Sequence, residues 1–136
     1  FDWRPHPKSF TAGELAGHLV ECLRWAERVF AADAFDFSPA TYERVRANTV
    51  AEVLAAFDAS VEAALQAMAN TADRDAAQSW RMSRNGVVFF ERDREAAFRD
   101  LSLHHLIHHR GQFTVYLRLL DVPLVGTYGP TADERR

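Results

Sequence analysis

Four of the six histidines of this chain lie in one short stretch near the C-terminus, at a spacing suited to metal binding. Apolar residues recur at helical spacing across residues 101–120, which contain all four. On a helical projection His105 and His109 lie near the middle of the apolar side, and His104 and His108 lie at its edge. Two histidines four residues apart on a helix point the same way, so both imidazoles can reach one metal ion. His105 and His109 are therefore the candidate pair.

The same spacing also arises by chance in a histidine-rich helix. In that interpretation two of the histidines are hydrogen-bonded core residues and the other two lie on the surface. A buried neutral imidazole needs a partner for each ring nitrogen, and two in the middle of an apolar stripe double that demand unless a metal meets it. The residues alone leave both interpretations open.

A metal held by two histidines of one helix needs further ligands from another element. His18 lies on the apolar side of an earlier helical pattern, next to Cys22 and Trp25. A lone histidine in such a position is more often a core residue with a hydrogen-bond partner. Cys22 is also able to bind a soft metal, although a small buried hydrophobic residue is the simpler interpretation of this position. His18 gains interest because the histidine pair lacks a third ligand.

Three helices are expected to position these side chains. Residues 11–14 have the form of a capping box, and an amphipathic pattern follows over 15–30. Residues 49–52 repeat this signal, and charged residues from 91 onward predict a last helix over 91–120. The apolar residues of the second helix, all expected to face the core, are Val50, Val53, Leu54, Phe57, Val61, Leu65 and Met68.

The remaining segments are expected to connect these helices. Residues 1–10 form an extended lead-in, and 31–48 form a loop held to the body by its aromatic side chains. In 79–90 an Asn-Gly pair favours a tight turn, which predicts either a small hairpin or a plain loop. The expected fold class is all-α, an up-and-down four-helix bundle, with its first helix in residues that precede Phe1.

The composition limits the class of protein. With 136 residues, 48% of them hydrophobic, the chain predicts one domain spanning residues 1–136. A net charge of −3 without a basic stripe argues against nucleic acid as a partner. Cys22 is the only cysteine, which fits a cytoplasmic location, and no apolar run is long enough to predict a membrane span.

Several motifs resemble those of the DinB-like proteins, a family of metal-binding bundles. The most specific is HLIHHRGQ at residues 105–112, which is followed by YLRLL at 116–120 and YGPTADE at 128–134. Near the N-terminus, DWRPHPKS at residues 2–9 and ELAGH at 14–18 are also similar to the family. The resemblance covers most of the chain.

The resemblance implies a four-helix bundle in which three histidines hold a divalent metal ion. Carried over by motif, these are His18, His105 and His109, whereas His104 and His108 do not match ligand positions. Zinc is the expected metal, with nickel or iron as alternatives, because imidazole suits all three. Family members carry a helix before the Trp-x-Pro lead-in, and the chain departs from the family pattern there.

The resemblance also implies a reaction, since family members with known activity include metal-dependent thiol transferases and a thiol-dependent isomerase. The expected function is transfer of a small-molecule thiol to an electrophile, and a homodimer is an expected assembly. The alternatives are a non-catalytic metal-binding stress-response module and a metal-dependent hydrolase. The candidates for a general base or substrate anchor, none in a forced position, are Glu21, Gln112, Tyr116 and Tyr128. Arg110 is either a support for the ligands or a structural residue.

Overall fold

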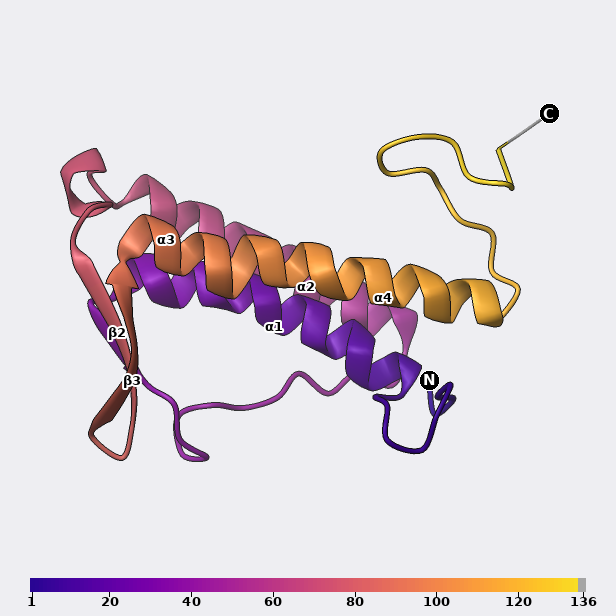
Figure 1. The fold of residues 1–136 in the computed structure, drawn as a ribbon, viewed down its shortest axis with the longest axis horizontal. Coiled ribbons are helices and arrows are strands. Elements are labelled where there is room, and N and C mark those ends of the chain that lie inside the picture. The colour runs from indigo at the N-terminus through magenta and orange to yellow at the C-terminus, as the bar shows by residue number, and fades with distance from the viewer. Residues whose placement is uncertain (135–136) are drawn as a thin grey trace.

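The computed structural model describes residues 1–134, apart from the side chain of Arg74, and consists of three long helical segments with a small sheet at one end (Figure 1). Helix α1 spans Ala12–Ala31 and helix α2 spans Val50–Ala69. Between α2 and the sheet lies a short 3-10 turn, η1, at Asp73–Asp75.

The third helical segment is continuous but changes its helix type twice. It begins as α3 (Arg94–Phe98), becomes the π-helical segment η2 (Arg99–His104), and continues as α4 (His105–Leu119). In a π-helical segment the backbone hydrogen bonds span five residues instead of four. Such segments are frequent at functional sites. Here the π-helical segment ends directly before His105, the first candidate ligand of this helical segment.

The predicted helix starts on α1 and α2 are confirmed. The Thr11 hydroxyl accepts from the Glu14 backbone N–H at 3.1 Å, and the Glu14 carboxylate accepts from the Thr11 N–H at 2.7 Å, which completes a capping box. On α2 the Thr49 side chain accepts from the Glu52 N–H at 3.2 Å. These bonds satisfy backbone donors that have no partner within the helix, so they fix where each helix begins.

The prediction of an all-α four-helix bundle is wrong, because the described chain combines three helical segments with a three-stranded mixed sheet, at 51% helix and 12% strand. The sheet has the order β1-β2-β3, with β1 at Ala34–Asp36, β2 at Ser79–Arg84 and β3 at Val87–Asp93. Strand β1 pairs parallel to β2, and β2 pairs antiparallel to β3.

The hairpin was one of the two alternatives for residues 79–90, and its turn has the backbone that Asn-Gly favours. Asn85 has φ of 51° and Gly86 has φ of 78°, the left-handed values that a tight two-residue hairpin requires. The hairpin also continues past the predicted start of the last helix, since Ser79 pairs with Asp93 across the strands. The helix therefore begins at Arg94, with the Asp93 carboxylate accepting from the Ala96 N–H at 2.7 Å.

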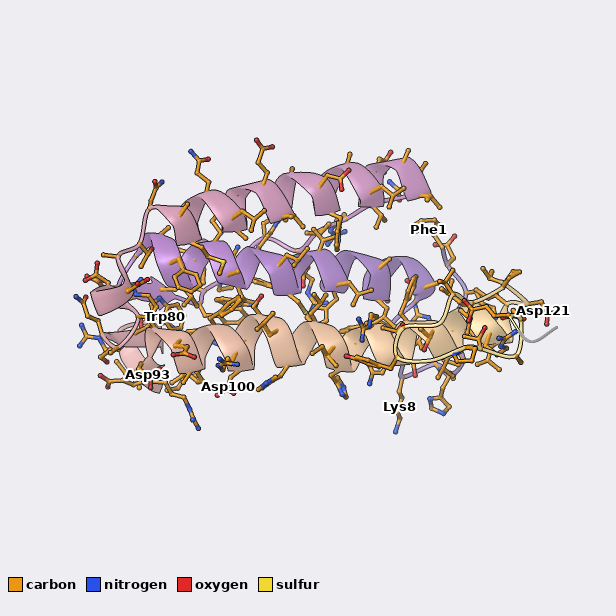
Figure 2. The ribbon with its side chains drawn as sticks, turned by 90° about the horizontal axis from the view of Figure 1, so that it is seen from above. Phe1, Lys8, Trp80, Asp93, Asp100 and Asp121 are labelled. Atoms are coloured by element: carbon orange, nitrogen blue, oxygen red, sulfur yellow. The ribbon has the colours of Figure 1, made fainter. Side chains whose placement is uncertain are left out.

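The helix α1 lies between α2 and the α3–α4 segment, and all three run along the length of the molecule (Figure 2). The core is concentrated where α1 meets the sheet and α3, and it is built from Trp25, Val29, Trp80, Met82 and Ala97. Among the described residues, no helix is both long and apolar enough to cross a membrane.

The expectation that α2 directs its whole apolar side into the core is wrong. Val50 is 63% exposed, Leu54 56% and Leu65 61%, and the buried residues of α2 are the small Ser60 and Ala64. A cavity of 480 Å³ lies between α1, α2 and α4, and its lining is almost wholly apolar. No described element covers this side of the molecule, which explains why large apolar residues of α2 remain in contact with solvent.

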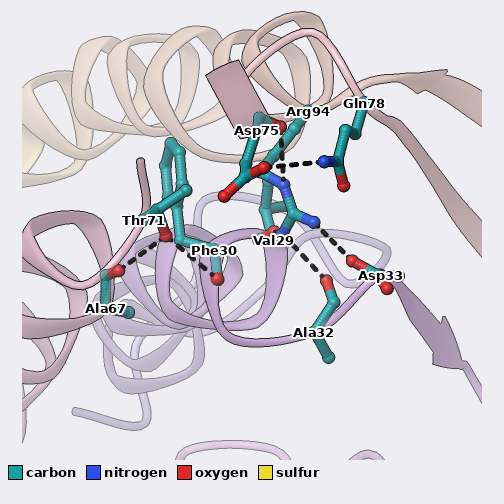
Figure 3. A network of polar contacts seen from close by, with 9 residues as sticks. All are labelled: Val29, Phe30, Ala32, Asp33, Ala67, Thr71, Asp75, Gln78 and Arg94. Carbon is teal, nitrogen blue, oxygen red and sulfur yellow. Dashed lines mark hydrogen bonds and ion pairs between the residues drawn. The ribbon is translucent and has the colours of Figure 1, made fainter. Parts of the chain in front are cut away.

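The sheet end of the third helical segment is fixed to α1 by Arg94 (Figure 3). Its guanidinium donates to the backbone carbonyls of Val29 and Ala32, at the C-terminal end of α1, and forms an ion pair with Asp33 at 2.6 Å. Its Nε also donates to the Asp75 carbonyl at 3.3 Å. The side chain is only 4% exposed, so these contacts set the relative position of the two helices that carry the candidate histidines.

Candidate metal centre

The structure brings the rings of His18, His105 and His109 into mutual contact between α1 and α4. The ring centroids of His18 and His105 lie 5.0 Å apart, those of His18 and His109 4.5 Å, and those of His105 and His109 4.7 Å. His104 and His108 are exposed, and His104 lies 3.7 Å from the Asp100 carboxylate. The histidine pair on α4 and the lone histidine on α1 therefore form one cluster. That this cluster binds a metal stays a prediction.

The chain supplies a hydrogen-bond acceptor for two of the three rings. His18 Nδ1 lies 2.7 Å from the Glu21 carboxylate, and His109 Nδ1 lies 2.7 Å from the Gln112 side-chain oxygen. An acceptor at Nδ1 holds the proton there and leaves the Nε2 lone pair available, which is the tautomer of a metal-binding histidine.

Glu21 is the buried centre of this hydrogen-bond network and is 3% exposed. Besides His18, it accepts from the Tyr42 hydroxyl at 2.7 Å and from the Val45 backbone N–H at 2.8 Å. Burial acts to raise the pKa of Glu21, but these three hydrogen bonds outweigh burial and hold the pKa below its ordinary value. Glu21 is thus an ionised acceptor that orients the His18 ring.

The pKa values of the other two histidines favour the neutral form. Burial, followed by the electrostatic interaction with His18, lowers the pKa of His105, and the Leu101 backbone acts in the opposite direction. Burial also lowers the pKa of His109, although the hydrogen bond to Gln112 acts in the opposite direction. Both imidazoles are therefore neutral at pH 7, the form that binds metal ions.

The separation of two ring nitrogens fits a tetrahedral metal. His18 Nε2 and His105 Nε2 lie 3.4 Å apart. At zinc–nitrogen distances of ~2.0–2.1 Å and a tetrahedral angle of about 109°, two ligand nitrogens lie ~3.3–3.4 Å apart. With the protons on both Nδ1 atoms, the facing Nε2 atoms would present two lone pairs to each other, an arrangement that a shared cation would stabilise.

Cys22 offers a second possible ligand set. The ligand atoms of His18, Cys22 and His105 all lie within 4.8 Å of one another, so this group is compatible with a metal ion, and within the described residues His109 does not belong to it. Cys22 is fully buried, and burial together with the nearby Glu21 charge raises the pKa of its thiol to about 12. A ligand sulfur must lose its proton, which the surroundings of Cys22 oppose.

The sequence also suggested possible roles at the site for Gln112, Tyr116, Tyr128 and Arg110. Gln112 contacts His109 directly, whereas the Tyr116 hydroxyl donates to the Phe10 carbonyl at 3.1 Å. Tyr128 is 85% exposed and accepts from Arg110 at 3.1 Å. Arg110 thus contacts the C-terminal segment rather than a ligand.

Tyr42 and the Val45 backbone were not anticipated as parts of the site. They belong to the segment 31–48, whose aromatic residues indicated only attachment to the body of the protein. Their place beside Glu21 depends on how this loop folds back over α1, and nothing in the local sequence pattern encodes it.

A cavity of 240 Å³ lies next to Tyr42, His18 and His105 and gives access to the cluster.

Comparison with known proteins agrees with this architecture. The sequence model of the DinB superfamily matches residues 1–113. The fold is similar to the crystal structure of a DinB-like protein, YjoA, from Bacillus subtilis, with a TM-score of 0.70 and 16% sequence identity. That match covers 96% of this chain and 83% of the other. No curated protein matches the sequence significantly.

Proposed function

This chain belongs to the DinB superfamily, and we propose that it binds a divalent metal ion through His18, His105 and His109 and transfers a small-molecule thiol to an electrophile. The observation that supports the metal site is the contact among the three rings, in which acceptors at Nδ1 of His18 and His109 favour the tautomer with an available Nε2 lone pair. We propose zinc as the metal, and imidazole ligands also suit nickel and iron.

Three neutral imidazoles leave the charge of a divalent ion undiminished and leave at least one coordination position open. When bound, such an ion favours the thiolate form of a thiol, which is the nucleophilic form. In the transfer a carbon–sulfur bond forms, and either the bond from that carbon to a leaving group or the π bond of an activated double bond breaks. The thiol proton ends on the leaving group or, for an activated double bond, on the carbon beside the new bond.

The chain's own residues orient the ligands and limit the competing nucleophiles. Glu21 fixes the tautomer of His18, and Tyr42 supports Glu21 from the loop side. Burial, followed by its hydrogen bond to Glu21, raises the pKa of Tyr42, so the phenol stays protonated and acts as a donor. Cys22 remains a protonated, buried thiol and is assigned to packing rather than to nucleophilic work.

The test is conjugation of mycothiol, bacillithiol and glutathione to a model electrophile, followed by mass spectrometry with zinc-loaded and metal-free protein. We expect turnover with at least one thiol in the loaded protein, and its loss in His109→Ala. The matched control is His104→Ala, since His104 is an exposed histidine of the same helical segment and lies against the Asp100 carboxylate. A rate equal to the uncatalysed reaction with every thiol would favour a non-catalytic metal-binding protein.

A further inference from the structure

The residues that line the cavity beside the histidine cluster indicate which kind of ligand would fit there. It measures 240 Å³, below the ~300–1,000 Å³ typical of sites for drug-sized ligands, so it suits a molecule of about one ring. His18 and His105 line it on the side of the cluster. The apolar part of the lining consists of Trp25, Phe37, Tyr42, Met82, Phe89 and Leu101.

Aromatic side chains dominate the apolar part of the lining. The rings of Trp25 and Tyr42 are nearly parallel, with an interplanar angle of 16° and centroids 5.9 Å apart, and Phe37 lies 4.6 Å from Tyr42. Such surfaces favour a flat apolar ligand by stacking and edge contacts. Met82, an adaptable side chain, fills space beside them.

Arg84 is the one residue with a permanent charge among the described residues that line this cavity. Its guanidinium lies 5.1 Å from the Phe37 ring centroid and 5.9 Å from that of Phe89, and its Nε donates to the Phe37 carbonyl at 3.3 Å. These contacts hold the side chain at the cavity. Its two terminal nitrogens make no hydrogen bond or ion pair within residues 1–134, so their donors are available to a ligand.

We propose that this cavity binds the electrophilic substrate and that the substrate is a flat, apolar carboxylate of about one ring. The ring packs against the aromatic lining, and the carboxylate pairs with the terminal nitrogens of Arg84, whose planar fork matches a carboxylate. The description of this ligand as the substrate rests on the proposed thiol transfer. Binding at the cavity does not depend on that reaction.

The test is an NMR titration with 3-phenylpropionate and its neutral counterpart 3-phenylpropanamide, followed through the Trp25 indole N–H. Neither compound is an electrophile, so the measurement reports binding alone. We expect saturable shifts in both zinc-loaded and metal-free protein, with the acid bound about fivefold or more tightly than the amide. Arg84→Gln should remove this preference without weakening the amide.

The control is Arg81→Gln, which removes the same charge from an exposed position on β2 outside the cavity and should keep the preference for the acid. If Arg84→Gln does not fold, Arg84→Lys keeps the charge, loses the planar fork and should bind the acid more weakly than the wild type. Equal affinities for acid and amide, no saturable shift, or acid binding only with zinc would overturn the proposal. Binding without thiol transfer would overturn the proposed function alone.

Discussion

At the scale of single residues, the properties of the cluster depend on the hydrogen bonds around its histidines. Glu21 is buried and ionised, and it fixes the orientation of His18 although it is not itself among the proposed ligands. The Gln112 side-chain oxygen likewise lies at hydrogen-bond distance from Nδ1 of His109 without being among the proposed ligands. Residues that hold metal-binding histidines in one tautomer commonly change metal affinity by ~10–100-fold when they are replaced.

We therefore predict that Glu21→Gln weakens zinc binding by about 10-fold or more, because an amide oxygen holds the His18 Nδ1 proton less strongly than a carboxylate does. Competition with a chromophoric chelator measures the affinity. Glu27→Gln, further along α1 and outside the cluster, serves as the control. Equal affinity of the Glu21 variant and the wild type would show that the Glu21–His18 contact does not support a metal site.

The residues that the sequence could identify are those with a periodic or motif signal. His18, His105 and His109 lie on the apolar faces of their helices, so helical projection separated the α4 pair from His104 and His108. The structure leaves His104 and His108 exposed, although the His108 ring lies 4.8 Å from that of His109. Tyr42 reaches Glu21 from an irregular loop 21 residues away, a contact that no local pattern encodes.

At the scale of elements, the two helices that carry the histidines are joined at the sheet end by Arg94. Its hydrogen bonds run to backbone carbonyls at the end of α1, where the helix leaves such acceptors without partners. The strands were harder to predict than the helices. Strand β1 has three residues, too few to show an alternating pattern, and β3 continues to Asp93 only because β2 pairs with it.

Arg94→Met should cost about 3 kcal/mol of unfolding free energy, because the methionine fills part of the space but leaves buried carbonyls without donors. Denaturant unfolding followed by circular dichroism measures the change. Asp33→Asn removes the ionic partner of Arg94, but Asp33 is 79% exposed and its replacement should have little effect. A variant at Arg94 as stable as the one at Asp33 would argue that the carbonyl contacts do not hold the helices together.

At the scale of the whole molecule, one side of the layer of helices is open. The large apolar residues of α2 remain exposed there, and helical periodicity predicted them as core because periodicity identifies an apolar face but not what covers it. The prediction of an all-α four-helix bundle was wrong because a three-stranded sheet joins the three helical segments, and its three-residue strand β1 leaves no pattern in the sequence. The single domain over residues 1–136 stays a prediction, and its last two residues lie outside the described part of the chain.

Because this side is open, replacing a buried and an exposed apolar residue should change the unfolding free energy by different amounts. Val20 is fully buried, so Val20→Ala should cost about 2 kcal/mol, whereas Leu54 is 56% exposed and Leu54→Ala should stay within about 0.5 kcal/mol. Denaturant unfolding measures both. A large cost at Leu54 would mean that another surface covers α2 in solution. Sedimentation of the same wild-type samples tests the homodimer, which stays a prediction.

The most direct test of the proposed metal site is the X-ray absorption spectrum of the zinc-loaded protein, recorded without added thiol. Ligation by His18, His105 and His109 predicts one bound zinc whose nearest neighbours are all nitrogen or oxygen at about 2.0–2.1 Å, with the outer-shell pattern of imidazole rings. A sulfur neighbour at about 2.3 Å would contradict this ligand set, because Cys22 is the only cysteine of the chain. Failure to retain stoichiometric zinc would contradict the metal site itself.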